Sequence, residues 1–195
     1  MRIVRAADAP RVRWRNDGGW TRELFREPAD GDDFDWRVSV AEVEMDGPFS
    51  AFVGYDRVLL LLEGAGMDLQ FTGADTGAGT GARSGSGTRA TAALRPDARR
   101  LRFTGEAPIT ATLVDGPTTD FNLICRRAAW VGDAELMTVQ TTVEFGGAGY
   151  AGAHVVSGSL TVLDGSRLFA GDTVISRQGE RIHLAGDASM VAFAL

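Results

Sequence analysis

The sequence contains no lysine, and all 20 of its basic residues are arginine. This absence excludes a phosphate-loop lysine and a Schiff-base lysine, because those chemistries need an ammonium or amine group. Every cationic site must therefore be a guanidinium, which favours binding of carboxylate or phosphate groups over proton transfer. The 26 acidic residues bring the formal net charge to -6, which argues against a nucleic-acid partner.

Cysteine and histidine are also scarce. The single cysteine, Cys125, excludes an intramolecular disulfide and a cysteine-rich zinc site. No histidine lies near it in the sequence to act as a base, so we expect a buried structural thiol. His154, His183 and Glu180 offer the donor types of a metal triad. Because they lack His-x-His and His-x-x-x-Glu spacing, we predict neither a metal site nor a cofactor.

Long hydrophobic runs are missing as well. The longest run of large apolar residues, Val58–Leu62, is far shorter than the roughly 20 residues of a membrane helix. The N-terminus shows no apolar segment of a secretory signal. With 44% apolar residues and only 6 prolines among 195 residues, the composition is that of a folded domain. We therefore expect a soluble, cytoplasmic protein with no membrane partner.

Short apolar segments between Gly- and Asp-rich turns predict an all-β fold, either a sandwich or a barrel. The segment Trp36–Glu44 alternates apolar and polar residues with one slip, which indicates a half-buried strand with a bulge. The best helix candidate is a turn or two around Asp120–Arg127. The other predicted strands are Val58–Leu62, Met67–Phe71, Leu101–Phe103, Ile109–Val114, Met137–Phe145, His154–Val156, Ser159–Leu163 and Met190–Phe193.

Residues 72–93 interrupt this pattern. The segment has no large apolar side chain and consists mostly of Gly, Thr, Ala and Ser. We predict a flexible, Gly-rich hairpin insertion, because the segment cannot bury enough apolar surface to order itself. Within it, Gly85–Ala90 loosely fits a dinucleotide-binding loop. That segment neither follows a clear strand nor opens a helix, so we do not expect a nucleotide there.

A weak internal repeat relates the two halves of the chain. Leu59–Phe71 has the pattern strand, Gly turn, strand, and Val155–Leu163 has the same pattern around Ser157-Gly158. This duplication resembles a pair of cupin barrels and predicts a bicupin of RmlC-like architecture, although two unrelated hairpins are an alternative. The predicted halves of the single unit 1–195 are residues 1–127 and 128–195, approximately.

Three polar, turn-rich loops carry most of the remaining chemistry: Trp14–Glu23, Gly47–Arg57 and Asp115–Asn122. They supply Arg, Asn, Thr and Ser side chains without a nucleophile–base pair. Such a mixture suits the binding of a small anionic molecule better than its chemical conversion. Turns and strand-end caps are the structural alternative for each loop.

These loops resemble the HutD/Ves family of bicupin-like bacterial proteins. Asp17 and Val53 depart from the Gly and Pro that the family usually has. The resemblance implies an association with histidine utilisation and no firm enzymatic activity. The matching motifs, in the family's order, are Trp14–Glu23, Trp36–Ser39, Gly47–Ser50, Gly54–Arg57, Phe103–Glu106, Asp120–Asn122 and Arg126-Arg127.

The resemblance also implies a pocket for a small pathway acid, such as formylglutamate or urocanate, and a regulatory role. Arg57 is the first choice for binding the ligand carboxylate, because a planar guanidinium makes two parallel hydrogen bonds to it. Asp56 would orient Arg57 or cap the strand, and a buried structural ion pair is the alternative role for Arg57. The matching pocket residues are Asn16, Thr21, Arg22, Ser50, Arg57, Asp120 and Asn122.

Two other functions stay open, although the pattern favours a binding protein over an enzyme. An enzyme acting on the same acid would use Glu23 or Asp120 as general base and Arg57 as an electrostatic clamp. An interaction module would dock on a protein partner and keep only a vestigial pocket. An edge strand such as Trp36–Glu44 could also pair between subunits and form a homodimer.

Overall fold

The computed structural model describes residues 1–30, 33–72, 83–84 and 89–195. In this part of the chain it has eighteen β-strands and a single short 3-10 helix, Ala6–Asp8, which confirms the predicted all-β fold. None of the described residues form a helix long and apolar enough to cross a membrane. The chain divides into an N-terminal unit, Arg11–Val131, and a C-terminal unit that combines Gly132–Leu195 with Met1–Pro10.

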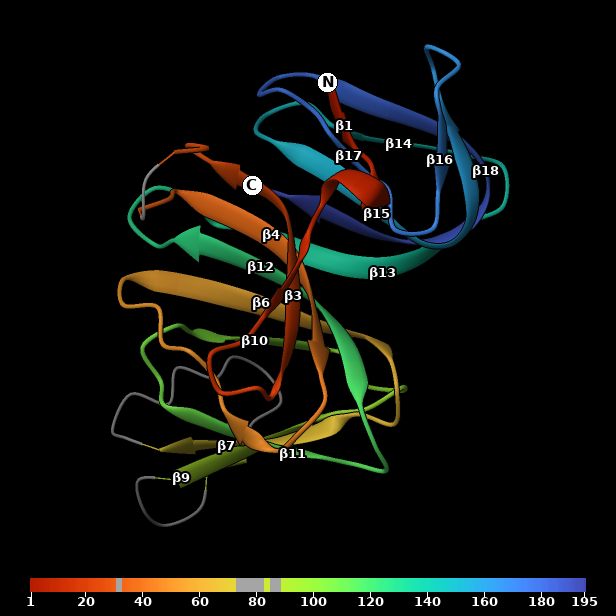
Figure 1. Ribbon diagram of the computed structural model, residues 1–195. Helices are drawn as coiled ribbons and strands as arrows, with labels where there is room; N and C mark the ends of the chain where they lie inside the picture. Colours follow the sequence, from red (N-terminus) through yellow and green to blue (C-terminus); the bar gives the residue numbers. More distant parts are fainter. Residues whose placement is uncertain (31–32, 73–82, 85–88) are drawn as a thin grey trace. The chain divides into compact units, whose positions relative to one another are not determined.

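The first sheet of the N-terminal unit has six antiparallel strands in the order β10-β6-β12-β4-β3-β2. Strands β4, β12 and β6 run side by side at its centre (Figure 1). The strands of this sheet are β2 (Arg11–Arg13), β3 (Gly19–Glu27), β4 (Trp36–Val43), β6 (Tyr55–Glu63), β10 (Arg100–Thr104) and β12 (Thr118–Arg126).

The second sheet of this unit has the order β5-β11-β7-β9-β8. In β7 buried and exposed residues alternate strictly, as expected for a strand with one face in the core. The strands are β5 (Gly47–Pro48), β7 (Met67–Thr72), β8 (Arg83–Ser84), β9 (Arg89–Leu94) and β11 (Ile109–Leu113).

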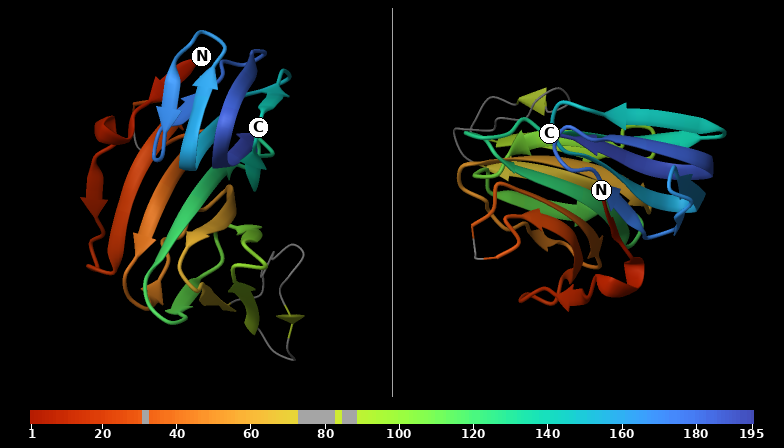
Figure 2. Two further views of the ribbon diagram at one scale, coloured as in Figure 1. Left: turned by 90° about the vertical axis from the view of Figure 1, so that its right-hand side faces the viewer. Right: turned by 90° about the horizontal axis from the view of Figure 1, so that it is seen from above.

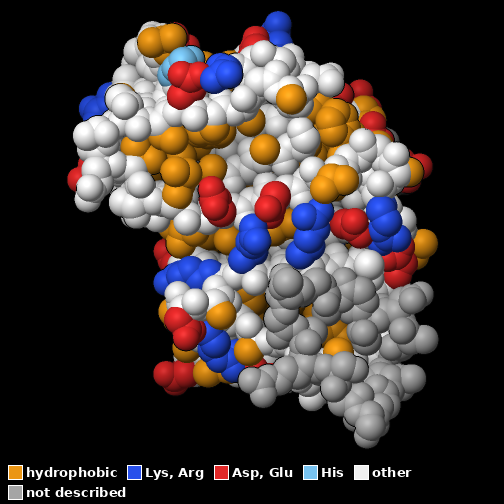
Figure 3. Space-filling model, turned by 180° about the vertical axis from the view of Figure 1, so that it is seen from behind, with side chains coloured by type: hydrophobic (Ala, Val, Ile, Leu, Met, Phe, Trp, Pro, Cys, Tyr) orange, Lys and Arg blue, Asp and Glu red, His pale blue; other side chains and the backbone are white. Residues whose placement is uncertain are grey.

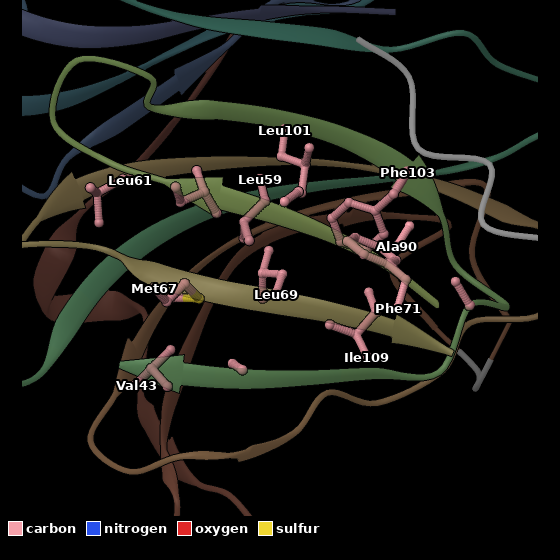
Figure 4. Packing of buried hydrophobic residues seen from close by; sticks show 14 residues of the cluster. Val43, Leu59, Leu61, Met67, Leu69, Phe71, Ala90, Leu101, Phe103 and Ile109 are labelled. Atoms are coloured by element: carbon pink, nitrogen blue, oxygen red, sulfur yellow. The ribbon is translucent and has the colours of Figure 1, made fainter. Parts of the chain in front are cut away.

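A hydrophobic core joins the two sheets of the N-terminal unit. Leu59 and Leu61 of β6 belong to the same buried cluster as Leu69 and Phe71 of β7 (Figure 4). The rings of Phe71 and Phe103 meet edge to face, with centroids 5.6 Å apart. This core covers one face of the six-stranded sheet, which we call the interior face.

The C-terminal unit is a seven-stranded antiparallel sheet with the main order β1-β17-β15-β18-β13, while β14 pairs with β18 and β16 with β15. Both chain ends belong to this unit (Figure 2). Residues 1–10 were predicted to belong to the N-terminal half, but β1 pairs with β17 of the C-terminal unit. The strands are β1 (Arg2–Val4), β13 (Asp133–Val139), β14 (Thr142–Gly146), β15 (Ala151–Val162), β16 (Arg167–Phe169), β17 (Thr173–Ile175) and β18 (Arg181–Ala194).

Strand β4 forms where a strand was predicted, but two details of that prediction are wrong. The pairing of β4 with β12 is continuous, and the bulge lies on β3, where Glu23 pairs with Ser39 and Phe25 pairs with Val38. Leu24 is therefore the extra residue. In addition, β4 is not an edge strand, because β3 and β12 pair with its two sides. It offers no free edge for pairing between subunits.

The helix predicted around Asp120–Arg127 is also wrong, because β12 occupies this region as a central strand. Polar Asp120 and Asn122 alternate with apolar Phe121 and Leu123, and all four are buried. Both faces of the strand are thus covered, one of them around polar side chains. This arrangement hides the apolar alternation by which a half-buried strand is usually identified.

The predicted turn at Ser157-Gly158 is an irregularity inside the long strand β15. Gly158 has a φ of +81°, and a side chain there would meet the carbonyl oxygen of Asp187. Glycine is favoured in such a conformation, and Gly158 keeps its pairing with Ala188. The bulge lies just before it, at Val156, since Val155 pairs with Met190 and Ser157 with Ser189. The strand predicted over Met137–Phe145 is instead two strands, β13 and β14.

The Gly-rich segment 72–93 lies largely outside the described residues, as does most of Gly85–Ala90. What is described at its ends is regular structure. Thr72 closes β7, β9 begins at Arg89, and Ala90 and Ala92 are buried in the core. Small side chains at these two positions fit between larger core residues, which explains why a strand without large apolar residues still packs.

Candidate functional site

Polar side chains gather on the interior face of the six-stranded sheet. Residues at alternate positions of a strand share a face, so Arg57 lies on the same face of β6 as the core residue Leu59. Across the sheet, Asn122 pairs with Leu59 and Asp120 pairs with Leu61. The register therefore places Arg57, Asn122 and Asp120 together on the covered face of β6 and β12.

Arg57 is only 5% exposed and is held by neutral groups. Its Nη2 donates a hydrogen bond of 2.8 Å to Asn122 Oδ1, and its Nη1 donates one of 3.3 Å to the backbone carbonyl of Ser50. In the described part of the chain the guanidinium makes no ion pair with a carboxylate. The alternative role of Arg57, a structural ion pair, therefore finds no support among these residues.

Aromatic rings surround the guanidinium of Arg57. The rings of Phe49, Phe52 and Phe103 lie 5.0 to 5.6 Å from it, within the range of cation–π attraction. Phe49 and Phe52 come from the loop that follows β5, and Phe103 from β10. The loop thus covers Arg57 with two rings and one backbone carbonyl.

A second guanidinium shares these rings. Arg37 of β4 lies 5.2 Å from the rings of both Phe34 and Phe52. In register it pairs with Ile124 of β12, which in turn pairs with Arg57 of β6. The two arginines therefore lie on the same face of the sheet, one on each side of β12.

The two arginines carry an incompletely balanced positive charge. Burial and the nearby charge of Arg37 lower the pKa of Arg57 to about 9, and burial likewise lowers the pKa of Arg37. Both groups stay protonated at neutral pH. The Nε atoms of both are buried and make no hydrogen bond within the described residues. Glu23 lies 3.8 Å from Arg37 and is 39% exposed, so it screens that charge only partly.

Asp120 has a different environment from the arginines. Its side chain is completely buried, and Oδ2 lies 3.1 Å from the hydroxyl of Thr118. Its other oxygen, Oδ1, has no hydrogen-bond partner among the described residues. Burial raises the pKa of Asp120 to about 7, because the charged form loses its hydration.

The remaining predicted residues have separate local contacts. The Asn16 side chain is exposed and accepts a hydrogen bond from the Gly18 backbone, as in an Asx turn. Thr21 Oγ1 accepts a hydrogen bond of 2.7 Å from the Trp14 indole. Arg22 pairs with Val40, which places it on the sheet face opposite Arg57. Ser50 contributes its backbone carbonyl to the site.

Asp56 does not orient Arg57. Its carboxylate lies 2.8 Å from Arg127 Nε, and the same guanidinium binds Glu106. Sequence adjacency was misleading here, because Asp56 and Arg57 project from opposite faces of β6. The ion pairs of Arg127 with Asp56 and Glu106 instead connect the start of β6 to the turn after β10.

Arg37 and Phe52 lie in the candidate site but were not predicted as site residues. Both stand inside or beside motifs that were recognised, Arg37 in Trp36–Ser39 and Phe52 after Gly47–Ser50. Arg37 and Ser39 are two positions apart on one strand, and this spacing alone could have placed both side chains on the covered face. The position of Phe52 follows from the path of a loop and leaves no periodic signal.

The histidines occupy separate environments in the C-terminal unit. His154 is buried, with Nδ1 2.9 Å from the Thr173 hydroxyl. His183 lies at the surface beside Glu144, which also binds Arg181, and Figure 3 shows a histidine next to acidic and basic side chains. Within the described residues no three potential metal ligands come together.

Two open hollows, of about 570 and 620 Å³, lie in the C-terminal unit. Thr138 borders both, and the lining of the first contains no charged side chain, while that of the second contains Asp187 as its only charged one. Neither offers a cation to an acidic ligand. The chemistry predicted for the ligand is matched by the arginines of the N-terminal unit and not by these hollows.

Known proteins resemble this chain in sequence and in fold. A Pseudomonas putida protein described as an uncharacterized 21.2 kDa protein in the hutC 3' region is 37% identical over 126 residues. The match covers 64% of this chain and 57% of that protein, so it spans little more than half of the curated relative. The structure of HutD from Pseudomonas fluorescens SBW25 covers 99% of this chain with 28% identity and a TM-score of 0.75, and 97% of its own chain is matched.

The likeness in fold reaches further than the likeness in sequence. A Bacillus subtilis oxalate decarboxylase variant matches 99% of this chain and 76% of its own chain, with a TM-score of 0.66 and only 7% identity. At that identity the match shows the fold alone, and it confirms the predicted cupin architecture. The model of the HutD family matches residues 6–193. This chain is therefore a member of the HutD family.

Proposed function

We propose that this chain binds a small carboxylate metabolite on the interior face of its N-terminal unit and has a regulatory role in histidine utilisation. One observation carries the binding proposal: Arg57 is buried without a carboxylate partner among the described residues, next to Arg37. A buried charge is costly unless it is paired. A ligand carboxylate would supply the missing partner.

The donors suit a carboxylate better than a large anion. The buried Nε–H groups of Arg57 and Arg37 are available for charge-assisted hydrogen bonds. The rings of Phe49 and Phe52 restrict the space around them, which favours a small or planar ligand. Entry would require the loop that carries these rings to move outward and release the Ser50 carbonyl from Arg57.

The histidine-utilisation context rests on relatives. The Pseudomonas putida relative is described by its position in the hutC 3' region, and a solved relative is called HutD. Together with the family resemblance, these names support formylglutamate and urocanate as the first acids to test. A cytoplasmic location is part of the same proposal.

The test is isothermal titration calorimetry of the full chain with formylglutamate and urocanate. Arg57→Gln removes the charge and keeps most of the side-chain volume. Arg102→Gln is the matched control, because Arg102 lies on β10 beside Phe103 but on the opposite face of the sheet. We expect saturable binding by the wild type and by Arg102→Gln, and at least a tenfold loss in Arg57→Gln, since charge-assisted hydrogen bonds contribute about 1.5–3 kcal/mol.

Binding that is equal in all three proteins would refute the assignment to Arg57. The enzyme alternative is tested on the same samples, since mass spectrometry of the acids after incubation shows whether product has formed. Turnover that disappears in Asp120→Asn or Glu23→Gln would replace the binding function with a catalytic one.

A further inference from the structure

Strand β12 carries a row of polar side chains along the interior face. Thr118, Asp120 and Asn122 occupy alternate positions, and all three are buried. Side chains two positions apart on a strand are separated by roughly 6.5 Å. The carboxyl group of Asp120 therefore lies about one such step from the Asn122 amide, which itself holds Arg57.

Two buried atoms in or beside this row lack a hydrogen-bond partner, one a donor and the other an acceptor. Beside Asn122, Nε of Arg57 is a buried donor without an acceptor among the described residues. In the middle of the row, Oδ1 of Asp120 is a buried acceptor without a donor in the same part of the chain. Such atoms are uncommon in folded proteins, because each costs the free energy of its lost hydration. A donor and an acceptor of this kind on one face indicate a ligand with a group for each.

We propose that Asp120 is the second recognition group of the carboxylate site and that it accepts a hydrogen bond from an N–H group of the ligand. The ligand class is then a small acid with a carboxylate at one end and an ammonium, amide or ring N–H at the other. This proposal rests on the proposed function, because the carboxylate of the same ligand binds Arg57.

The chemistry of Asp120 fits this role in either protonation state. When the carboxyl is ionised, both oxygens accept hydrogen bonds. When it is neutral, a proton on Oδ2 can be donated to the Thr118 hydroxyl, 3.1 Å away, which leaves Oδ1 an acceptor. A second carboxylate of the ligand would find no donor at Oδ1. The site should therefore discriminate against simple dicarboxylates.

The test uses three acids with matched carbon chains. 5-Aminopentanoate has an ammonium at one end and a carboxylate at the other. Pentanoate lacks the donor, and glutarate replaces it with a second carboxylate. We expect calorimetry on the full-length wild type to show 5-aminopentanoate binding at least tenfold more tightly than either of the other two.

Two variants at one position isolate the contribution of Asp120. Asp120→Leu fills the same space without polar atoms, and Asp120→Asn keeps the size but removes the charge. We expect Asp120→Leu to lose the preference for 5-aminopentanoate while pentanoate binds within threefold of the wild type. Asp120→Asn keeps an acceptor oxygen and should retain part of the preference. Circular dichroism confirms folding, and the comparison of the three acids on the wild type decides the question even if Asp120→Leu does not fold.

The outcomes separate this proposal from the proposed function. Equal affinity of the wild type for all three acids, or a tenfold preference that persists in the folded Asp120→Leu variant, overturns the role of Asp120 and leaves the carboxylate site intact. Failure of all three acids to bind, when formylglutamate or urocanate does bind, overturns the inclusion of ammonium donors in the ligand class. Failure of every acid overturns the proposed function itself.

Discussion

Arg57 and Asn122 come from neighbouring strands, and a buried guanidinium is held there by a neutral amide at 2.8 Å. An amide satisfies one donor of the arginine without cancelling its charge. This arrangement leaves the positive charge available to a ligand. Replacing the amide with a carboxylate should therefore favour the unliganded state.

The first prediction is the effect of Asn122→Asp on ligand binding. The new carboxylate would form an ion pair with Arg57 and compete with the acid, so we expect at least a tenfold loss of affinity with no loss of thermal stability. Calorimetry and a thermal melt measure the two quantities. Asn122→Ala is the control, because it removes the hydrogen bond without adding a charge. Affinity of Asn122→Asp equal to that of the wild type would contradict the prediction.

The second prediction concerns Asp120 and pH. Burial raises its pKa from 3.8 to about 7. Between these values the unfolded chain has lost this proton and the native state keeps it, so the free energy of unfolding falls as pH rises through this window. Asp120→Asn removes this contribution. Urea unfolding should show that the variant gains roughly 2–3 kcal/mol relative to the wild type between pH 5 and pH 8. Parallel pH profiles of the unfolding free energy for the wild type and Asp120→Asn would contradict the prediction.

The third prediction concerns His154 in the C-terminal unit. Burial lowers its pKa from 6.5 to about 4, and Asp172 offsets this only partly. Its neutral form is the native one, so stability from this group is present above pH 6.5 and is lost as pH falls through about 4. An NMR titration should show the His154 ring resonances unchanged between pH 7 and pH 5.5. A midpoint near 6.5 would mean that the ring is accessible to solvent.

The fourth prediction tests the core that supports the site. Leu69 is fully buried between the two sheets of the N-terminal unit. Leu69→Ala should lower the free energy of unfolding by about 2–5 kcal/mol, because it removes apolar contacts and leaves a cavity. Gln70→Ala on the exposed side of β7 should change it by less than about 0.5 kcal/mol. Urea denaturation of the two variants checks the contrast, and similar losses would disprove it.

The strands with a simple hydrophobic pattern were predictable from the sequence. β7 alternates residue by residue, and the centre of β6 is a continuous apolar run, so both were recognised. β12 was mistaken for a helix because Asp120 and Asn122 point into the interior and break the pattern. The polar residues of the candidate site are thus the ones that made β12 difficult to recognise as a strand.

The site was predictable in part for a related reason. Arg57, Asn122 and Asp120 were identified from the family resemblance, and the register brings them onto one face. Their contacts could not be derived from sequence spacing, because Arg57 and Asn122 are 65 residues apart. Arg37 and Phe52 were missed because their proximity to Arg57 depends on strand order and on a loop path.

The pairing of β1 with β17 also sets the order of assembly during synthesis. Val4 leaves the ribosome long before its partner, Thr173, whereas the whole N-terminal unit lies between them in the chain. The N-terminal unit can fold around Arg57 before β1 pairs with β17. A nascent chain would therefore form the region around Arg57 before β1 pairs with β17, and synthesis of the later strands would complete only the second unit.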